Sequence, residues 1–120
     1  MILLTSVNDQ LQLVTDSAAA LDVHATWVDI VTSSATITPG RLNTKIAAAT
    51  TTSVAGSPAT STQRNMKTLH VRNHDASLSV NLSVKHTDGT IVVQLYQCKL
   101  SAGDALEYVD QGGFILKPAA

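Results

Sequence analysis

A chain of 120 residues is long enough to bury one hydrophobic core and too short for two, which predicts a single domain over residues 1–120. Only 3% of the residues are aromatic, so aliphatic side chains must fill that core. The single cysteine, Cys98, excludes an internal disulfide and favours synthesis in a reducing compartment. No apolar run approaches the roughly 18 residues of a membrane span, and the N-terminus lacks the basic segment of a signal peptide. We therefore expect a soluble protein that is made in the cytoplasm and has no membrane partner.

The first 40 residues contain three segments that favour β structure. Gln10–Val14 has the length and composition of a short strand, and Leu21–Trp27 alternates apolar with polar residues. A period of two is expected when one face of a strand is buried. Thr36–Thr38 leads into Pro39–Gly40, a dipeptide typical of a turn.

The middle of the chain is rich in small residues and threonine. Residues 43–54 contain no Gly or Pro and predict a strand, with a helix through Ile46–Ala49 as the alternative. Four Thr between positions 44 and 52 favour the strand, because branching at Cβ restricts χ1. Gly56–Thr62 has the composition of an exposed loop, and Met66–Val71 predicts the next strand.

The last third predicts a meander of antiparallel strands. Residues 77–85 alternate strictly, and Asp88–Gly89 separates them from the apolar Ile91–Tyr96. Because Asp and Gly tolerate the positive φ of a tight turn, this pair predicts a hairpin. Ser101–Asp104 is a second turn-like break before Ala105–Val109, which predicts a second hairpin.

These segments amount to eight to ten short strands in one domain. That pattern predicts an all-β fold, a two-sheet antiparallel β-sandwich, with the jelly roll as one such arrangement. A closed barrel is the second choice.

Charge is distributed unevenly along a chain whose net charge is only −1. Residues 1–40 hold four Asp and no Lys or Arg, whereas residues 41–74 hold five Lys or Arg and no acid. These charges either pair within one molecule or meet between neighbouring subunits, where Arg41 and Lys45 are candidate contacts. A nucleic-acid partner is not expected, because the basic stretch has no interleaved aromatic residues and the pI is near 6.4.

The side chains that commonly carry catalysis or bind metal form no recognisable constellation. His70 and His74 are four residues apart, which on a strand separates them by roughly 13 Å, so we expect no metal site there. Cys98 lies in an alternating strand and is expected to act as a small hydrophobe rather than a nucleophile. The sequence contains no G-x-S-x-G, G-x-G-x-x-G, G-x-x-x-x-G-K or H-E-x-x-H motif. We expect no enzymatic activity and no cofactor.

Within residues 66–108 the chain reads TLHVRNHDASLSVNLSVKHTDGT, followed by VVQLYQCKLSAGDALEY. This stretch resembles the small β-rich virion proteins of tailed bacteriophages. In that family a "hVRN" strand precedes an "SxxVxhxVxxxDGT" strand, a further strand and an "L-x-x-G-x-x-L-x-Y" close. Residues 61–65 add weaker similarity, so the resemblance covers roughly the C-terminal half.

The resemblance implies a structural role in a virion assembled in the cytoplasm of a bacterial host. The first expectation is a capsid decoration (cement) protein that clamps neighbouring major capsid subunits, and a head–tail (neck) or tail component is the runner-up. Proteins of this kind are usually symmetric oligomers, so a homo-oligomer is expected, a trimer first and a dimer second. A carbohydrate-binding module used in adsorption is the alternative from another class, since jelly rolls often bind sugars. An exposed Trp or Tyr lining a groove would favour that alternative.

Both ends of the chain are apolar and are candidates for subunit contacts. Apolar termini on so small a domain must pack either on their own core, as edge strands, or on a neighbour. The candidate residues are Met1, Ile2, Leu3 and Leu4 at the start and Phe114, Ile115 and Leu116 at the end.

Overall fold

A computed structural model describes residues 1–119, and within this range the protein is built from strands without a helix. The strands are β1 (Ile2–Leu4), β2 (Gln10–Thr15), β3 (Leu21–Val31), β4 (Ile37–Ile46), β5 (Thr51–Ala55), β6 (Thr62–Asn73), β7 (Val80–Thr87), β8 (Val92–Leu100), β9 (Ala105–Val109) and β10 (Gly113–Lys117). The predicted all-β class is confirmed.

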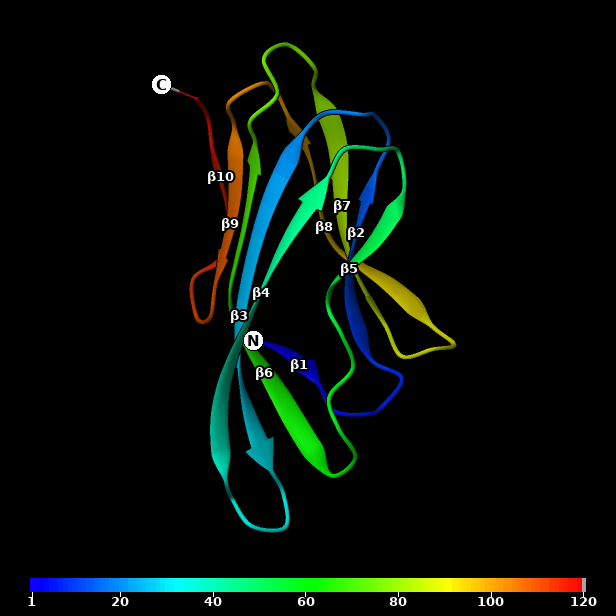
Figure 1. The fold of residues 1–120 in the computed structure, drawn as a ribbon, viewed down its shortest axis with the longest axis vertical. Helices are drawn as coiled ribbons and strands as arrows, with labels where there is room; N and C mark the ends of the chain where they lie inside the picture. Colours follow the sequence, from blue (N-terminus) through cyan, green and yellow to red (C-terminus); the bar gives the residue numbers. More distant parts are fainter. Residues whose placement is uncertain (120) are drawn as a thin grey trace.

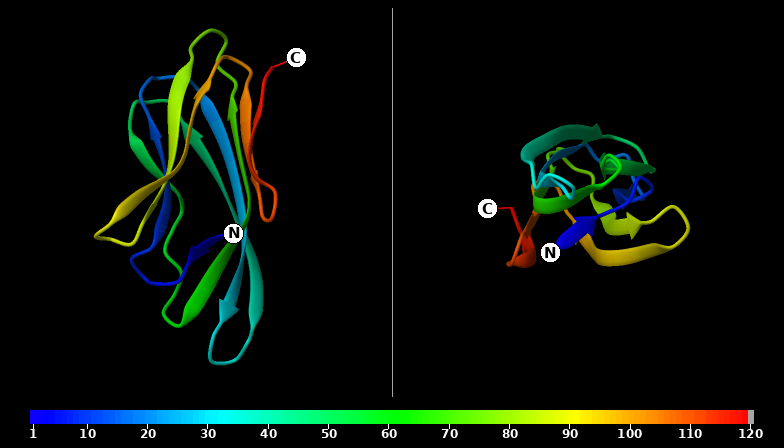
Figure 2. Two further views of the ribbon diagram at one scale, coloured as in Figure 1. Left: turned by 180° about the vertical axis from the view of Figure 1, so that it is seen from behind. Right: turned by 90° about the horizontal axis from the view of Figure 1, so that it is seen from below.

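Two antiparallel sheets pack face to face (Figure 1). The larger sheet has the order β10-β9-β6-β3-β4, and β1 pairs with the first half of β6. The smaller sheet has the order β5-β2-β7-β8. No ladder joins the two sheets within residues 1–119, so the fold is the predicted sandwich and not a closed barrel. The molecule is elongated, with extents of 49 × 29 × 20 Å, because β3, β4 and β6 extend beyond the smaller sheet (Figure 2).

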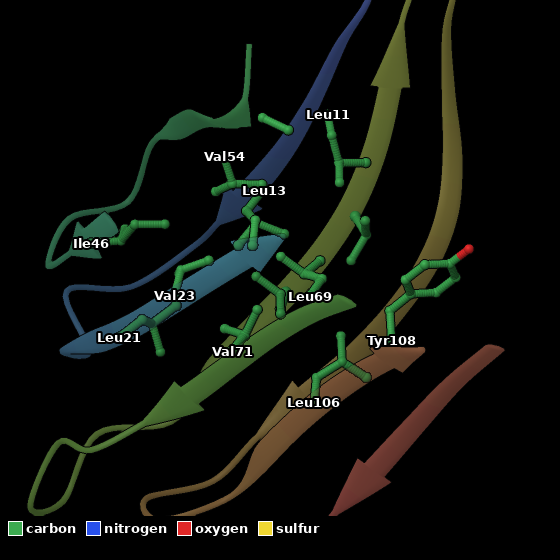
Figure 3. Close-up of a cluster of buried hydrophobic side chains, with 14 of the residues drawn as sticks. Leu11, Leu13, Leu21, Val23, Ile46, Val54, Leu69, Val71, Leu106 and Tyr108 are labelled. Carbon is green, nitrogen blue, oxygen red and sulfur yellow. The ribbon is translucent and has the colours of Figure 1, made fainter. Parts of the chain in front are cut away.

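Aliphatic side chains from the facing surfaces of both sheets form the core (Figure 3). Leu11 and Leu13 of β2 face Leu69 and Val71 of β6, and each is almost completely buried. Alternation of this kind explains why a chain with so few aromatic residues can bury a continuous core. Tyr108 is the one aromatic residue in the buried cluster as described for residues 1–119.

The turn predicted at Pro39–Gly40 is wrong, because β4 runs through both residues without interruption. β4 is an edge strand, where a proline costs no ladder hydrogen bond. Gly40 lies opposite Trp27 of β3, and a Cβ atom added at Gly40 would overlap the indole Nε1. The glycine therefore makes room for the tryptophan rather than reversing the chain.

The strand predicted over residues 43–54 is interrupted, and the alternative helix is also wrong. β4 ends at Ile46 and β5 begins at Thr51, while the segment between them carries the chain from one sheet to the other. The Thr15 hydroxyl donates to the carbonyl of Ala48, 2.7 Å away, and lies 3.2 Å from that of Thr50. These contacts hold the segment between β4 and β5 against the C-terminal end of β2.

The predicted hairpin at Asp88–Gly89 is confirmed as the turn between β7 and β8, with Gly89 at φ +94°. The second predicted hairpin is wrong. The turn at Ser101–Asp104 carries the chain out of the smaller sheet, and β9 pairs with β6 and β10 instead of β8. The start of the alternating segment also differs, because Leu78 lies outside β7 and is 45% exposed.

Candidate interaction surfaces

The lower part of the sandwich has an open side where apolar side chains surround a hollow of about 240 Å³. We call this surface the open corner. It is lined by Met1, by Ile2 and Leu3 of β1, by His86 of β7, and by Val93 and Leu95 of β8. Met1 is 72% exposed and Val93 is 46% exposed, so apolar surface borders the hollow on both sides.

The open corner exists because different strands lie beside β6 in the two halves of the sandwich: β9 and β10 in the upper half, and β1 alone in the lower half. In the upper half Phe114 of β10 stacks on Tyr96 of β8, with ring centroids 4.9 Å apart, and contacts Tyr108 at 5.0 Å. In the lower half the place of β9 is taken by β1, which pairs only with β6 among the strands described. The position beside β1, in line with β10, holds no strand within residues 1–119. Val93 and Leu95 are therefore left uncovered.

A polar pair lies under the open corner. The Nε2 atom of His86 is buried, has no hydrogen-bond partner within residues 1–119 and lies 3.9 Å from the Asp9 carboxylate. Burial alone would raise the pKa of Asp9, but hydrogen bonds donated by Thr5 and Ser6 outweigh burial and lower this pKa below its ordinary value. His86 is thus the polar side chain among the lining residues, and behind it lies a carboxylate that backbone hydrogen bonds hold in place.

The structure divides the predicted contact residues at the termini into buried and exposed ones. Ile2 and Leu4 are buried core residues of β1, and Ile2 also borders the open corner, whereas Met1 and Leu3 line this corner with exposed side chains. The three C-terminal candidates lie together on β10: Phe114 is partly buried in the aromatic stack, and Ile115 and Leu116 are exposed.

Sequence reasoning missed Val93 and Leu95, which line the corner with the N-terminal residues. The signal was available. Three consecutive apolar residues, Ile91–Val93, break the alternation that should place polar residues on one face. In the structure these three residues are 46–62% exposed, so the run marks apolar surface on both faces of an accessible strand end.

Acidic and basic segments of the sequence pair within the molecule. Lys45 lies 2.9 Å from Asp22, and Arg64 makes two hydrogen bonds to Asp29, at 2.9 and 3.0 Å. Arg41 has no carboxylate within 4 Å in residues 1–119. Of the two cations proposed for subunit contacts, Lys45 therefore has a partner in its own chain and Arg41 has none among the described residues.

The outer face of the larger sheet is polar and carries three of the four histidines. His24 and His70 are directly opposite on β3 and β6, and a hollow of about 490 Å³ adjoins both. His24 bonds Asn43, whereas His70 lies 3.7 Å from Glu107. His74 instead contacts Asp22, so the four-residue spacing of His70 and His74 does not form a shared site. No group of three possible metal ligands occurs in the part of the chain that the structure describes.

Cys98 and Trp27 lie outside the open corner, in different surroundings. Burial and, less strongly, the nearby Asp104 raise the pKa of the half-buried Cys98 thiol, as expected for a small hydrophobe. Trp27 lines a hollow of about 410 Å³ with Pro39 and Gly40, and the Arg64 guanidinium lies 4.5 Å from its ring centroid.

Comparison with protein-family models, curated proteins and solved structures finds no match to this chain. Over residues 1–119 the structure contains no helix of the length and hydropathy that crossing a membrane requires.

Proposed function

We propose that the protein is a non-enzymatic structural component of a phage virion that works by binding other protein subunits. The observation that carries this proposal is the open corner. Soluble monomers rarely expose a contiguous apolar surface of several hundred Å², and larger patches mark contact sites. Here apolar side chains that are 37–72% exposed surround a hollow at Met1, Leu3, Val93 and Leu95.

Free strand edges at the same place support a protein partner. Within residues 1–119, β1 pairs only with β6, and β8 pairs only with β7. Each of these two strands therefore offers unpaired backbone groups along its other edge. Exposed edges of apolar strands are templates for association, and natural proteins usually protect them. Lys99 is the single charged side chain that β8 offers as such protection.

The sequence resemblance supports a proposal for where in the virion the protein acts. Capsid decoration is the first choice, because a rigid sandwich with a polar sheet face and an apolar corner offers two different contact surfaces. We expect the purified protein to co-sediment with undecorated heads of the phage that encodes it and to saturate at a fixed number of copies per capsomer. Binding to necks or tails alone would favour the runner-up station, and binding to no virion part would refute the proposal.

One observation keeps the sugar-binding alternative as a second candidate. Trp27, the single tryptophan, lines a hollow on the larger sheet, although Arg64 covers one face of its ring. A bound sugar would then stack on the face of the Trp27 indole that Arg64 does not cover. Addition of host surface polysaccharide should then quench the Trp27 fluorescence in a saturable manner, and unchanged fluorescence would remove this candidate.

A further inference from the structure

We infer that the open corner binds a second copy of this chain, whose β7–β8 hairpin tip enters the hollow. This inference rests on the proposed function only in that the corner is used for protein contacts. It adds the identity of the partner. The tip is formed by residues 88–92, and its apolar side chains are Ile91 and Val92.

Shape makes the tip and the hollow complementary. The hairpin projects away from the body of the sandwich beside the corner (Figure 2). Ile91 is 62% exposed and Val92 is 54% exposed, so the projection is apolar where it is most accessible. The hollow, at about 240 Å³, has room for an aliphatic side chain. One molecule thus carries both an apolar projection and an apolar recess.

Charge favours a copy of the same surface over a charged partner. None of the residues that line the open corner is Lys, Arg, Asp or Glu. The acid at the tip, Asp88, is occupied, since its carboxylate accepts hydrogen bonds from the backbone N–H groups of Thr90 and Ile91 at 2.9 and 2.7 Å. A basic or acidic partner would bury its charges against this surface without compensation.

Area and symmetry favour mutual exchange of tips. The exposed apolar side chains of corner and tip supply part of the roughly 800 Å² per partner that a standard interface buries, and the polar rim around them supplies the rest. Because tip and hollow are neighbours on one side of the molecule, two copies related by a twofold axis can each insert a tip into the other. The family resemblance implies a trimer first and a dimer second, and this arrangement favours the dimer.

Sedimentation velocity tests the association. The wild type should sediment as a dimer at micromolar concentration, and Leu95→Asp should raise the dissociation constant at least tenfold. Ile37→Asp is the matched control, because Ile37 is 66% exposed but lies on β4, at the edge of the larger sheet opposite to β1. Ile37→Asp should leave the dimer intact. A wild type that stays monomeric at high concentration, or an equal effect of both variants, would overturn the inference.

Disulfide trapping tests the geometry and does not depend on the fold tolerating an aspartate. The two variants are Leu3→Cys and Ile91→Cys, each in a Cys98→Ser background. When they are mixed, the disulfide between the two variants should form many-fold faster than the disulfide that either variant forms alone. Replacing Ile91→Cys with Ile37→Cys should abolish the effect, and equal rates in both mixtures would overturn the inference.

Head binding separates this inference from the proposed function. A monomeric wild type that still saturates heads would leave the structural role standing and refute the second copy as partner. A dimer that exchanges tips but binds no virion part would refute the structural role alone.

Discussion

Gly89 is the residue whose identity the turn between β7 and β8 restricts most. Its φ of +94° is a conformation that side chains with a Cβ atom rarely adopt. A Cβ atom here would also lie 3.0 Å from Cβ of Asn8, in the turn that follows β1. Both the backbone and its packing therefore select glycine, and the Asp-Gly signal was sufficient to predict the hairpin.

Replacing Gly89→Val should lower the free energy of unfolding by about 1–3 kcal/mol, because a β-branched residue resists positive φ. Chemical denaturation followed by circular dichroism measures the change. Gly56→Val is the matched control: a Cβ atom added at Gly56 would have no other atom within 4 Å, and Gly56 has no positive φ, so this variant should be close to neutral. Equal effects of the two substitutions would show that φ is not the cause.

At the scale of elements, local residue chemistry identified strands well and their partners poorly. Strands at residues 10–14 and 66–71 followed from alternation and composition, and both are present within β2 and β6. The crossing at Ser101–Asp104 could not be predicted, because a turn motif specifies that the chain reverses and not which sheet receives the next strand. The same reason explains why only part of the open corner could be predicted. Its N-terminal residues were identifiable as an apolar terminus. Val93 and Leu95 of β8 line the corner only because no strand covers them, and this depends on strand pairing that the sequence does not show.

Continuity of β4 depends on a contact between strands that the sequence does not reveal. Trp27 and Gly40 are directly opposite in the β3–β4 ladder, and the indole occupies the space that a side chain at position 40 would need. An aromatic residue across from a glycine in a neighbouring strand is a known way to stabilise that glycine. Pro39–Gly40 therefore has turn chemistry in sequence and strand geometry in the fold.

Gly40→Ala should destabilise the protein by about 1–3 kcal/mol, because the added methyl group overlaps the Trp27 indole and forces it to move. Since Trp27 is the only tryptophan, its emission maximum should shift in the same variant. The double variant Trp27→Leu with Gly40→Ala should cost less than the sum of the two single variants. Strict additivity would mean that the two residues do not share this space.

Over the whole molecule, the acidic residues fall into two groups with different partners. Five aspartates accept hydrogen bonds from backbone N–H groups at strand ends and turns: Asp9, Asp16, Asp75, Asp88 and Asp104. The remaining four acids each lie within 4 Å of a Lys or Arg: Asp22, Asp29, Glu107 and Asp110. Each of these acids therefore has a partner within its own chain, so the uneven distribution of charge along the sequence does not require a partner molecule. This division also makes the ends of the sandwich sensitive to acid.

Stability should fall steeply in acid because these turns need ionised carboxylates. Hydrogen bonds from the backbone of Leu78 and Ser77 lower the pKa of Asp75, and those from Ile91 and Thr90 lower the pKa of Asp88. A group whose pKa is lower in the folded state stabilises the fold above its unfolded value, near 3.8, and this contribution is lost as pH falls through the folded pKa. The thermal midpoint should therefore lose the contribution of these turns as pH decreases below about 4.

The double variant Asp75→Asn with Asp88→Asn isolates the contribution of these turns to acid sensitivity. Asparagine keeps an oxygen that can accept the same backbone hydrogen bonds, but it does not titrate. The variant should be somewhat less stable than the wild type at pH 7, because an uncharged acceptor makes weaker hydrogen bonds. Its thermal midpoint should then decrease less between pH 4 and pH 2.5, so the two curves converge in acid. Parallel curves over that range would show that acid unfolds the protein through other groups, and the turns would then be held by their backbone conformation rather than by the charge of their aspartates.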